Sequence, residues 1–428
     1  MKNINIGIFG AGTVGKGVIK TLIDKSDLFF KRTGINIRIK SVCIKDINKK
    51  RDFPLENIIL TNNPNDILED DNIDIIVELI GGIQPCKDII FEAIKRKKHV
   101  VTANKELISK FWIDIYSLAE ENNVLVFIEG SVAGGIPIIQ TLKRDLISNK
   151  IQELVGIING TTNFILSEMT LKGKEFQETL KEAQRLGYAE ADPKNDIEGH
   201  DAKYKLAILS SLISEKFILP EKIYTEGITN ISKKDIEFAS KFGYVIKLLA
   251  ILKNHEDNKI ELRVHPCMIN KKHPLSSVNS SFNAIWLKGD LVGDFMLYGK
   301  GAGELPTSSS VVSDILNLCM EIKQGNYIHI NIKENHENIL EIENIYSKYY
   351  IRLLVEDKRG VIAIIGSIFD KADISINSLF QEDVYDNKAE IIIITHIVQE
   401  KNINNALLLM KNYKEILEVE NIIRLEDF

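Results

Sequence analysis

INIGIFGAGTVGKGVIKTLI, residues 4–23, is the stretch that decides the fold of this chain. An apolar run of strand type leads into a G-x-G-x-x-G pattern, and a helical pattern follows. This order is typical of a dinucleotide-binding βαβ unit. Gly10 allows a tight turn, Gly12 leaves room for a pyrophosphate, and Gly15 lets helix and strand pack closely, while the first N–H groups of the helix attract phosphate. The residues expected at the cofactor phosphates are Gly10, Gly12, Thr13, Val14 and Gly15.

Strands and helices alternate through the first third of the chain. After a second strand, INIRIKSVCI at 35–44, apolar runs are separated by helical patterns of about 10–15 residues. This alternation predicts a Rossmann-type, doubly wound parallel sheet, an α/β fold, over residues 1–137. Ligands of such sheets bind beyond the carboxyl ends of the strands, where residues 81–82, 102–105 and 129–135 fall.

The end of the second strand normally selects the cofactor. An acid there binds the ribose hydroxyls of NAD, whereas a cation accommodates the extra phosphate of NADP. Both charges are present as Lys45-Asp46, and Lys49, Lys50 and Arg51 follow closely. Lys45 therefore favours NADP(H), with NAD(H) as the alternative.

A second informative stretch is GYAEADPKNDIEGHDAKYK, residues 187–205. Its first half contains Gly, Pro and Asn and cannot form one regular helix, whereas its second half enters a largely apolar helical pattern. Asp201 and Lys205 share one face of that helix. A pair of an acid and a lysine at this spacing is most often a surface salt bridge. Here the pair follows a carboxylate-rich loop at the start of an apolar helix, which indicates the wall of a polar site. Lys105, at a strand end, is a further candidate, with a solvated loop lysine as the alternative.

Composition excludes several classes of protein. The 428 residues are 27% charged and 44% hydrophobic with a net charge of −6, a globular balance for two or three domains without a nucleic-acid partner. No apolar run has the length of a membrane span, and the N-terminus enters a strand directly, so we expect a cytoplasmic protein. The four cysteines lack metal-ligand spacing and are expected to be small buried apolar residues: Cys43, Cys86, Cys267 and Cys319.

The remainder of the chain predicts three further segments. An α+β domain is expected over residues 138–322, with KLAILSSLISE (205–215) and IEFASKFGYVIKLLAIL (236–252) as apolar helices. Its later apolar runs predict an antiparallel-rich sheet. A polar linker with two short alternating strands spans 323–347. Residues 348–428 follow the β-α-β-β-α-β order of a ferredoxin-like module.

Together these stretches resemble homoserine dehydrogenases over most of the chain, and residues from about 345 onward resemble an ACT regulatory domain. The matching blocks are GAGTVG at 10–15, ELIGG at 78–82, TANK at 102–105, EGSVAGGIP at 129–137, NGTTNFIL at 159–166, GYAEADP with DAKYK at 187–205, EGI at 226–228 and YGKGAGELPTSSSVV at 298–312.

The resemblance implies reversible NAD(P)H-dependent reduction of L-aspartate 4-semialdehyde to L-homoserine, on the route to threonine, methionine and isoleucine. It implies that Lys205 donates a proton to the carbonyl oxygen with Asp201 beside it. A lysine suits this role because hydride addition builds negative charge on that oxygen. The cofactor performs the redox step, so no transition metal is expected. The implied substrate ligands are Glu190, Asp196 and Lys105, and the implied further cofactor contacts are Thr102, Lys105 and Gly303.

Three further expectations follow from the resemblance. A monovalent cation, Na⁺ or K⁺, is bound through backbone carbonyls and one carboxylate of Glu129, Val132, Gly134 and Ile136. An amino-acid effector, threonine, binds the C-terminal module at the turn formed by Asp357, Gly360 and Val361. The chain forms a homodimer or homotetramer. The module is expected to be a separate sensor that truncation near Ile345 removes without loss of catalysis, and a structural appendage is the alternative.

Two other functions stay open on the sequence alone. One is another amino-acid or semialdehyde dehydrogenase. A semialdehyde dehydrogenase that forms a thioester needs a nucleophilic cysteine, and neither Cys43 nor Cys86 lies in an evident electropositive setting. The other is a non-catalytic sensor of NAD(P) and amino acids. A sensor would have no need of the group Glu190, Asp201 and Lys205.

Overall fold

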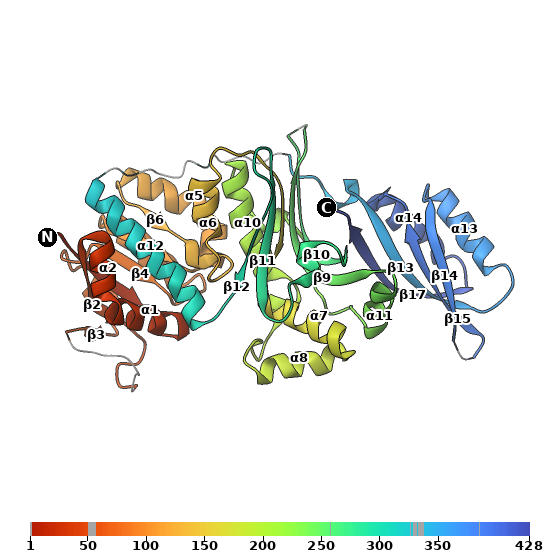
Figure 1. The fold of residues 1–428 in the computed structure, drawn as a ribbon, viewed down its shortest axis with the longest axis horizontal. Helices are drawn as coiled ribbons and strands as arrows, with labels where there is room; N and C mark the ends of the chain where they lie inside the picture. The colour runs from red at the N-terminus through yellow and green to blue at the C-terminus, as the bar shows by residue number, and fades with distance from the viewer. Residues whose placement is uncertain are drawn as a thin grey trace. The chain divides into compact units, whose positions relative to one another are not determined.

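The computed structural model of the chain describes residues 2–49, 57–256, 258–325, 338–384 and 386–428, together with Tyr327 and Ile332. They divide into two compact units (Figure 1). Unit 1 comprises residues 1–151, 203–222 and 282–337, and unit 2 comprises residues 152–202, 223–281 and 338–428. The first strand predicted in the linker, about residues 326–333, lies mostly outside the described residues.

Unit 1 contains the predicted parallel sheet, in the order β3-β2-β1-β4-β5-β6. Its strands are β1 (Lys2–Phe9), β2 (Ile35–Cys43), β3 (Ile59–Thr61), β4 (Ile75–Glu78), β5 (His99–Thr102) and β6 (Val126–Phe127). The helices between them are α1 (Thr13–Asp24), α2 (Ser26–Thr33), α3 (Asn65–Leu68), α4 (Cys86–Lys95) and α5 (Lys105–Glu121). The doubly wound α/β prediction is therefore confirmed.

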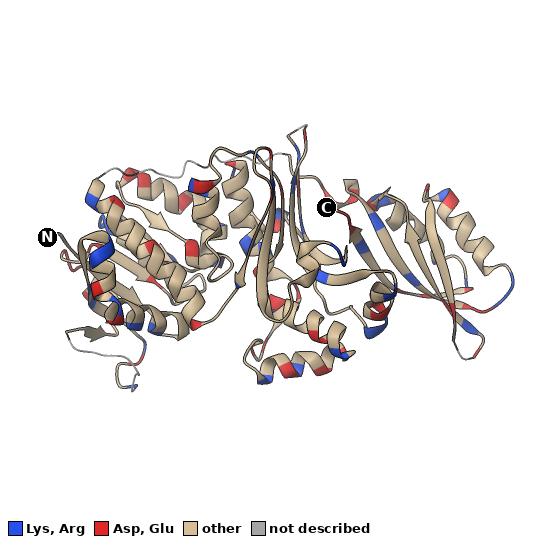
Figure 2. Ribbon diagram, in the orientation of Figure 1, with Lys and Arg blue, Asp and Glu red and all other residues tan. Residues whose placement is uncertain are grey.

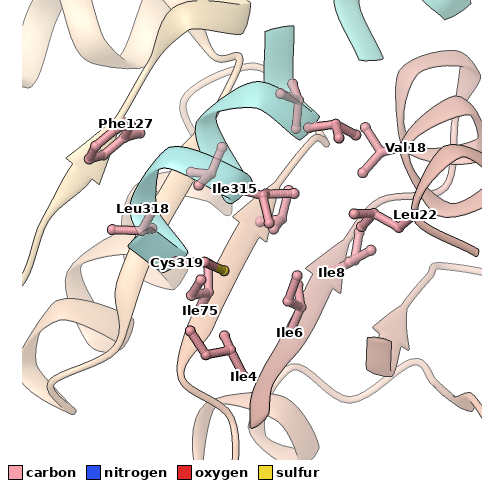
Figure 3. Packing of buried hydrophobic residues seen from close by; sticks show 14 of the residues in the cluster. Ile4, Ile6, Ile8, Val18, Leu22, Ile75, Phe127, Ile315, Leu318 and Cys319 are labelled. Carbon is pink, nitrogen blue, oxygen red and sulfur yellow. The ribbon is translucent and has the colours of Figure 1, made fainter. Parts of the chain in front are cut away.

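A helix from far along the sequence completes the core of unit 1. Helix α12 (Glu304–Gln324) packs beside α1 on the parallel sheet (Figure 1). Figure 3 shows Ile315 and Cys319 of α12 beside the strands that carry Ile6 and Ile75, with Leu318 on the side of Phe127, all of them buried. Each large aliphatic side chain buried in this way contributes about 1.5–3 kcal/mol. This packing fixes the N-terminal end of α12 close to the glycine loop.

Unit 1 also holds the segments after β6 and a hairpin. These are η1 (Glu129–Ser131), α6 (Ile138–Gln140), η2 (Thr141–Asp145), and the antiparallel strands β11 (Phe282–Gly289) and β12 (Gly293–Lys300). This hairpin agrees with the antiparallel pairing predicted from the later apolar runs of residues 138–322. Helix α10 (His200–Ser214) begins in unit 2 and ends in unit 1.

Unit 2 is built on a mixed sheet in the order β7-β9-β10-β17-β13-β15-β14. The strands are β7 (Ile151–Ile157), β9 (Tyr244–Asn254), β10 (Ile260–Asn270), β13 (Tyr346–Glu356), β14 (Ile376–Val384), β15 (Lys388–Thr395) and β17 (Ile416–Glu426), with the short β8 (Tyr224–Thr225) paired to β10 and β16 (Val398–Gln399) paired to β13. The helices are α7 (Gly160–Lys172), α8 (Phe176–Arg185), α9 (Lys194–Ile197), α11 (Lys233–Lys241), α13 (Val361–Lys371) and α14 (Glu400–Met410).

One helix prediction in this unit is wrong. The stretch 236–252 was expected to be a single helix, but α11 ends at Lys241 and the apolar run from Tyr244 forms β9. The turn at Gly243 has φ of +82°, a conformation that ends the helix. The run YVIKLLAIL is apolar throughout, and it pairs on both sides with β7 and β10. A continuous apolar run of this kind does not distinguish a buried strand from a buried helix.

The C-terminal module has the predicted β-α-β-β-α-β fold, with strand order β17-β13-β15-β14. Its core is closed by α13 and α14, with Tyr349, Ile351, Ile365 and Phe369 almost fully buried. Strand β17 also pairs in parallel with β10, through Cys267–Arg424, Met268–Leu425 and Ile269–Glu426. The module and the preceding strands of unit 2 therefore share one sheet.

Three expectations about general properties can be compared with the structure. All four cysteines are buried, as predicted, and none of them forms a disulfide. Acidic and basic residues are interspersed along surface helices such as α8 (Figure 2). Among the described residues, no helix combines the length and the hydropathy that a bilayer-crossing segment needs.

Candidate active site

The glycine loop after β1 has the geometry of a phosphate cradle. Gly10 has φ of +94°, and its N–H donates to the carbonyl of Cys43 at 2.9 Å. A Cβ at Gly15 would lie 2.2 Å from the carbonyl oxygen of Gly10, so a side chain there would separate helix from loop. A Cβ at Gly12 would touch no atom within 4 Å. Protein packing does not demand a glycine at position 12, which fits a role in leaving the backbone open to a ligand.

Two helix N-termini meet at this loop. Helix α1 begins at the exposed Thr13 after Gly12, with no side-chain cap and no acid in its first turn. The hydroxyl of Ser308 on α12 donates to the carbonyl oxygen of Val14 at 3.1 Å. Helix α12 is also uncapped by any side chain, and its N-cap Gly303 has φ of +122°. Uncapped N–H groups and the positive ends of two helix dipoles suit the phosphates of a dinucleotide.

Buried polar side chains fasten the loops after β4 and β5. The carboxylate of Glu78 accepts hydrogen bonds from the N–H of Ile80 at 2.7 Å and from the hydroxyl of Thr102 at 2.6 Å. Asn104 caps α5 by accepting from the N–H of Leu107 and donates to the carbonyl of Gly82. The Thr102 hydroxyl is thus used to hold the loops. Glu78 and Asn104 were missed from the sequence, although polar residues at the ends of buried strands gave a signal.

The cofactor-selecting position is accessible. Lys45 follows β2 and is exposed, while the carboxylate of Asp46 accepts a hydrogen bond from the N–H of Asn48 at 2.9 Å. One carboxylate oxygen of Asp46 is therefore already engaged in a hydrogen bond within the local turn. Lys50 and Arg51, the neighbouring cations expected to reinforce the choice, lie outside the described residues.

Two buried carboxylates lie close together, one from Glu129 after β6 and the other from Asp314 on α12. The Glu129 carboxylate accepts from the N–H groups of Ile139 at 2.9 Å and Gln140 at 2.8 Å, and the Glu129 N–H donates to Asp314 at 2.7 Å. Burial raises the pKa of Glu129 to about 7 and holds that of Asp314 well above its usual value. Lys143 nearby has a pKa lowered by burial.

The other expected cation ligands lie on the same buried loop. Val132 and Ile136 are almost fully buried. Gly134 has φ of +55° and fits against the carbonyl of Gly301, which a Cβ would approach to 2.4 Å. Its own carbonyl accepts from the Ser310 hydroxyl at 2.6 Å. A buried acidic pair beside a loop of buried backbone fits a hard monovalent cation with oxygen ligands.

Lys205, the expected proton donor, and Lys105, the expected ligand of substrate and cofactor, are carried by two helices of unit 1. Lys205 on α10 is buried, with 8% of its surface exposed, and the half-buried Lys105 is the first residue of α5. The ammonium of Lys110 on α5 lies 5.3 Å from the centroid of the Tyr204 ring on α10, so the two helices are in contact at this point. The predicted helix after the acidic loop is confirmed, and Asp201 lies on it one turn before Lys205.

In unit 2, one asparagine gathers two of the predicted acids. The side-chain amide of Asn159, at the end of β7, donates to Asp196 at 2.7 Å and to Asp201 at 2.9 Å. Its oxygen accepts from the N–H of Thr162 and so caps α7. Glu190 is exposed, and its backbone carbonyl accepts from the Gln184 amide at 3.1 Å. Asn159 was missed from the sequence, although an asparagine at a strand end before a helix was a usable signal.

Two other groups of reactive residues carry no catalytic chemistry. Burial, with Glu78 nearby, raises the pKa of the Cys86 thiol to about 12, and burial also raises that of Cys43. Neither thiol is therefore a nucleophile at neutral pH. Among the described residues, His265, Cys267 and Glu426 are close enough to hold a metal ion. The Arg263 guanidinium already binds two of these three groups, lying 2.8 Å from His265 and pairing with Glu426.

The fold and the site define the class of this protein, an NAD(P)-dependent dehydrogenase with a C-terminal ferredoxin-like module. Three family models match the chain: "Homoserine dehydrogenase, NAD binding domain" at residues 10–129, "Homoserine dehydrogenase" at 137–316 and "ACT domain" at 349–413. The chain belongs to the homoserine dehydrogenase family, and it is an NAD(P)-dependent oxidoreductase of amino-acid biosynthesis. This sets aside the thioester-forming dehydrogenase and the sensor without catalysis.

Similar proteins support this assignment over the full length. A Bacillus subtilis homoserine dehydrogenase is 38% identical, with 100% of this chain and 99% of the relative covered. The crystal structure of a homoserine dehydrogenase from Thiobacillus denitrificans has a TM-score of 0.94 at 41% identity, covering 100% of this chain and 99% of its own. A hyperthermophilic archaeal homoserine dehydrogenase in complex with NADPH has a TM-score of 0.63 at 27% identity, covering 77% of this chain and 100% of its own.

Proposed function

We propose that Lys205 is the proton donor of the reaction, that Asp201 orients it, and that Glu190, Asp196 and Lys105 bind the substrate. The observation that carries the proposal is the pairing of Asp196 and Asp201 by Asn159 at the start of the helix that carries Lys205. Aspartate semialdehyde has an ammonium group that carboxylates can bind and a carboxylate that a lysine can bind. When bound, NAD(P)H supplies the hydride.

The chemistry asked of Lys205 follows from the charge that develops on the substrate. Negative charge builds on the aldehyde oxygen during reduction, and a buried ammonium stabilises it more strongly than an ammonium in water does. Transfer of its proton yields the alcohol. In the reverse direction, the neutral amine accepts the proton from the homoserine hydroxyl. The same residue thus serves both directions.

We propose that NADP(H) is the preferred cofactor because Lys45 is exposed at the end of β2. In an assay of homoserine oxidation followed by the absorbance of the reduced nicotinamide, Lys45→Ala is expected to raise the KM for NADP⁺ about tenfold, and that for NAD⁺ much less. Lys40→Ala, earlier on β2 and paired with Asp70, is the control and should change neither KM. An equal rise for both cofactors after Lys45→Ala would contradict the proposal.

We propose threonine as the effector of the C-terminal module. A cavity of about 300 Å³ opens at the turn after β13. Its lining includes Asp357, Gly360, Val361, Gln381 and Ile391. Gly360 has φ of +92° and precedes α13, which has no side-chain cap. The free N–H groups of α13 suit the carboxylate of an amino acid, and Asp357 suits its ammonium group.

Asp357→Asn is expected to weaken inhibition by threonine about tenfold, without a change in kcat or KM when threonine is absent. The physical reason is the loss of a charge opposite the effector's ammonium group. The measurement is a threonine titration at fixed homoserine and NADP⁺, with Asp373→Asn, an exposed residue after α13, as the control. If wild type shows no threonine inhibition at all, the module is a structural appendage.

Three further assignments complete the proposal. A monovalent cation at Glu129 and its loop is supported by the buried acidic pair, and a rise in Tm with NaCl or KCl relative to choline chloride tests it.

A homodimer or homotetramer is supported by the exposed apolar side chains along β12, Met296 and Tyr298 among them, and light scattering tests it. We also propose a cytoplasmic location, supported by the four cysteines, none of which forms a disulfide, and tested by cell fractionation.

A further inference from the structure

Arg424 on the last strand, β17, joins the C-terminal module to a segment outside it. The guanidinium is buried and binds both carboxylate oxygens of Glu400, the first residue of α14, at 2.8 and 2.5 Å. Its remaining nitrogen donates to the carboxylate of Glu226 at 2.9 Å. Tyr224 lies under the guanidinium, with its ring centroid 5.1 Å away, and donates its hydroxyl to the same oxygen of Glu226 at 3.1 Å.

The segment held by Arg424 is packed directly on the acidic loop. The N–H of Glu226 donates to the carbonyl of Val264 on β10, and the N–H of Ile228 donates to the carbonyl of Ile197 at 2.8 Å. A Cβ at Gly227 would lie 2.4 Å from the Ile197 carbonyl oxygen and 2.7 Å from the Cα of Glu198. The two backbones are thus in contact with no space for a side chain between them, so a shift of one displaces the other.

The contacted part of the loop lies between the two acids that Asn159 holds. Asp196 is in α9, which ends at Ile197, and Asp201 follows the turn at Gly199. Gly199 has φ of +82°, and a Cβ there would lie 3.0 Å from the side chain of Thr225. Residues 224–228 therefore contact this turn at two points, through Thr225 at Gly199 and through Gly227 at Ile197.

We infer that Arg424 is a positioning residue for substrate binding, supplied by the C-terminal module. It fixes residues 224–228 through Glu226, and these residues fix the backbone between Asp196 and Asp201. The planar fork of an arginine suits this role because it binds Glu400 in bidentate fashion while a third nitrogen reaches Glu226. The inference rests on the proposed function of the acidic loop.

Glu226→Gln is the decisive variant. The Glu226 side chain is 33% exposed, and Arg424 keeps its pair with Glu400, so no buried charge loses its partner and the protein should fold. We expect the KM for L-homoserine to rise about tenfold, with kcat and the KM for NADP⁺ within about twofold of wild type. Arg424→Lys should raise the same KM, but it should also lower Tm, because a lysine cannot keep the bidentate pair with the buried Glu400 or the bond to Tyr224. The KM of the double variant should be no higher than that of the worse single variant, because both changes remove the contact between Arg424 and Glu226.

Arg352→Lys is the matched control. Arg352 is a second buried arginine of the same sheet, bound to Asp235, Glu390 and Glu420. The Arg352→Lys variant should lose stability without any change in the KM for homoserine. A rise equal to that of Arg424→Lys would mean general loosening and would overturn the inference.

Asp196→Asn is measured in the same assay. It separates the positioning role of Arg424 from the substrate-binding role of the acidic loop. A raised KM for homoserine in Asp196→Asn together with an unchanged KM in folded Glu226→Gln refutes the positioning role alone. An unchanged KM in Asp196→Asn refutes the assignment of the acidic loop, and the inference with it. A raised KM in Asp196→Asn, Glu226→Gln and Arg424→Lys, but not in Arg352→Lys, supports both.

Discussion

Lys205→Ala is expected to lower kcat by about two to four powers of ten, because the proposed mechanism uses Lys205 both as proton donor and as the cation opposite the developing oxyanion. Tm and the affinity for NADP⁺ should change little. The measurement is steady-state homoserine oxidation, together with a binding titration of NADP⁺ to the same preparation. Lys205→Arg keeps the charge but transfers a proton poorly, so it should recover little of the lost rate.

Lys203→Ala provides the control on the same helix. Lys203 is half-buried and lies two residues before Lys205, with its ammonium 6.0 Å from the centroid of the Tyr204 ring. Its replacement should leave kcat near that of wild type. Turnover of Lys205→Ala within about threefold of wild type would remove the lysine from the mechanism, since general acids contribute far more than that.

Deletion of residues 345–428 is expected to destabilise the enzyme strongly, contrary to the separable sensor expected from the sequence. Strand β17 covers β10 along Cys267–Ile269. The fully buried Arg263 pairs with Glu426 of β17 as well as with Glu261. Deletion would leave an exposed sheet edge and a buried arginine with one of its two partners. Loss of one partner of a buried ion pair costs about 3–5 kcal/mol, and open sheet edges aggregate.

Thermal unfolding of the deletion variant and of Glu426→Gln measures these contributions. Burial opposes ionisation of Glu426, but the Arg263 guanidinium prevails and lowers its pKa to about 2 from 4.5. A depressed carboxyl pKa stabilises the fold above about pH 4.5, and this stabilisation is lost as the pH falls toward 2. Wild type should show this loss, and Glu426→Gln should lack it. Glu418→Gln, exposed on the same strand, should match wild type. A deletion variant with the wild-type Tm would show that the module is separable after all.

Much of the fold was predictable because its signals are local. The glycine spacing at 10–15 and the strand–helix alternation identify the parallel sheet, since each βαβ unit encodes its own periodicity. The ferredoxin-like order of 348–428 is predictable for the same reason. The error at 236–252 has a local cause too. A run that is apolar at every position has no period, and only its pairing with β7 and β10 makes it a strand.

The sequence by itself determined the dinucleotide-binding fold and placed an acid-rich loop before Lys205, and the family resemblance, not the residue pattern alone, pointed to the chemistry. Only the tertiary structure decided which distant segments act together. It brought α12 against α1, made Asn159 the partner of both Asp196 and Asp201, and joined Arg424 to Glu226. The physical reason is that hydrophobic periodicity is written within each segment. The partner of a buried polar group is set by the packing of segments far apart in the chain, as Arg424 and Glu226 are, and no local pattern identifies it.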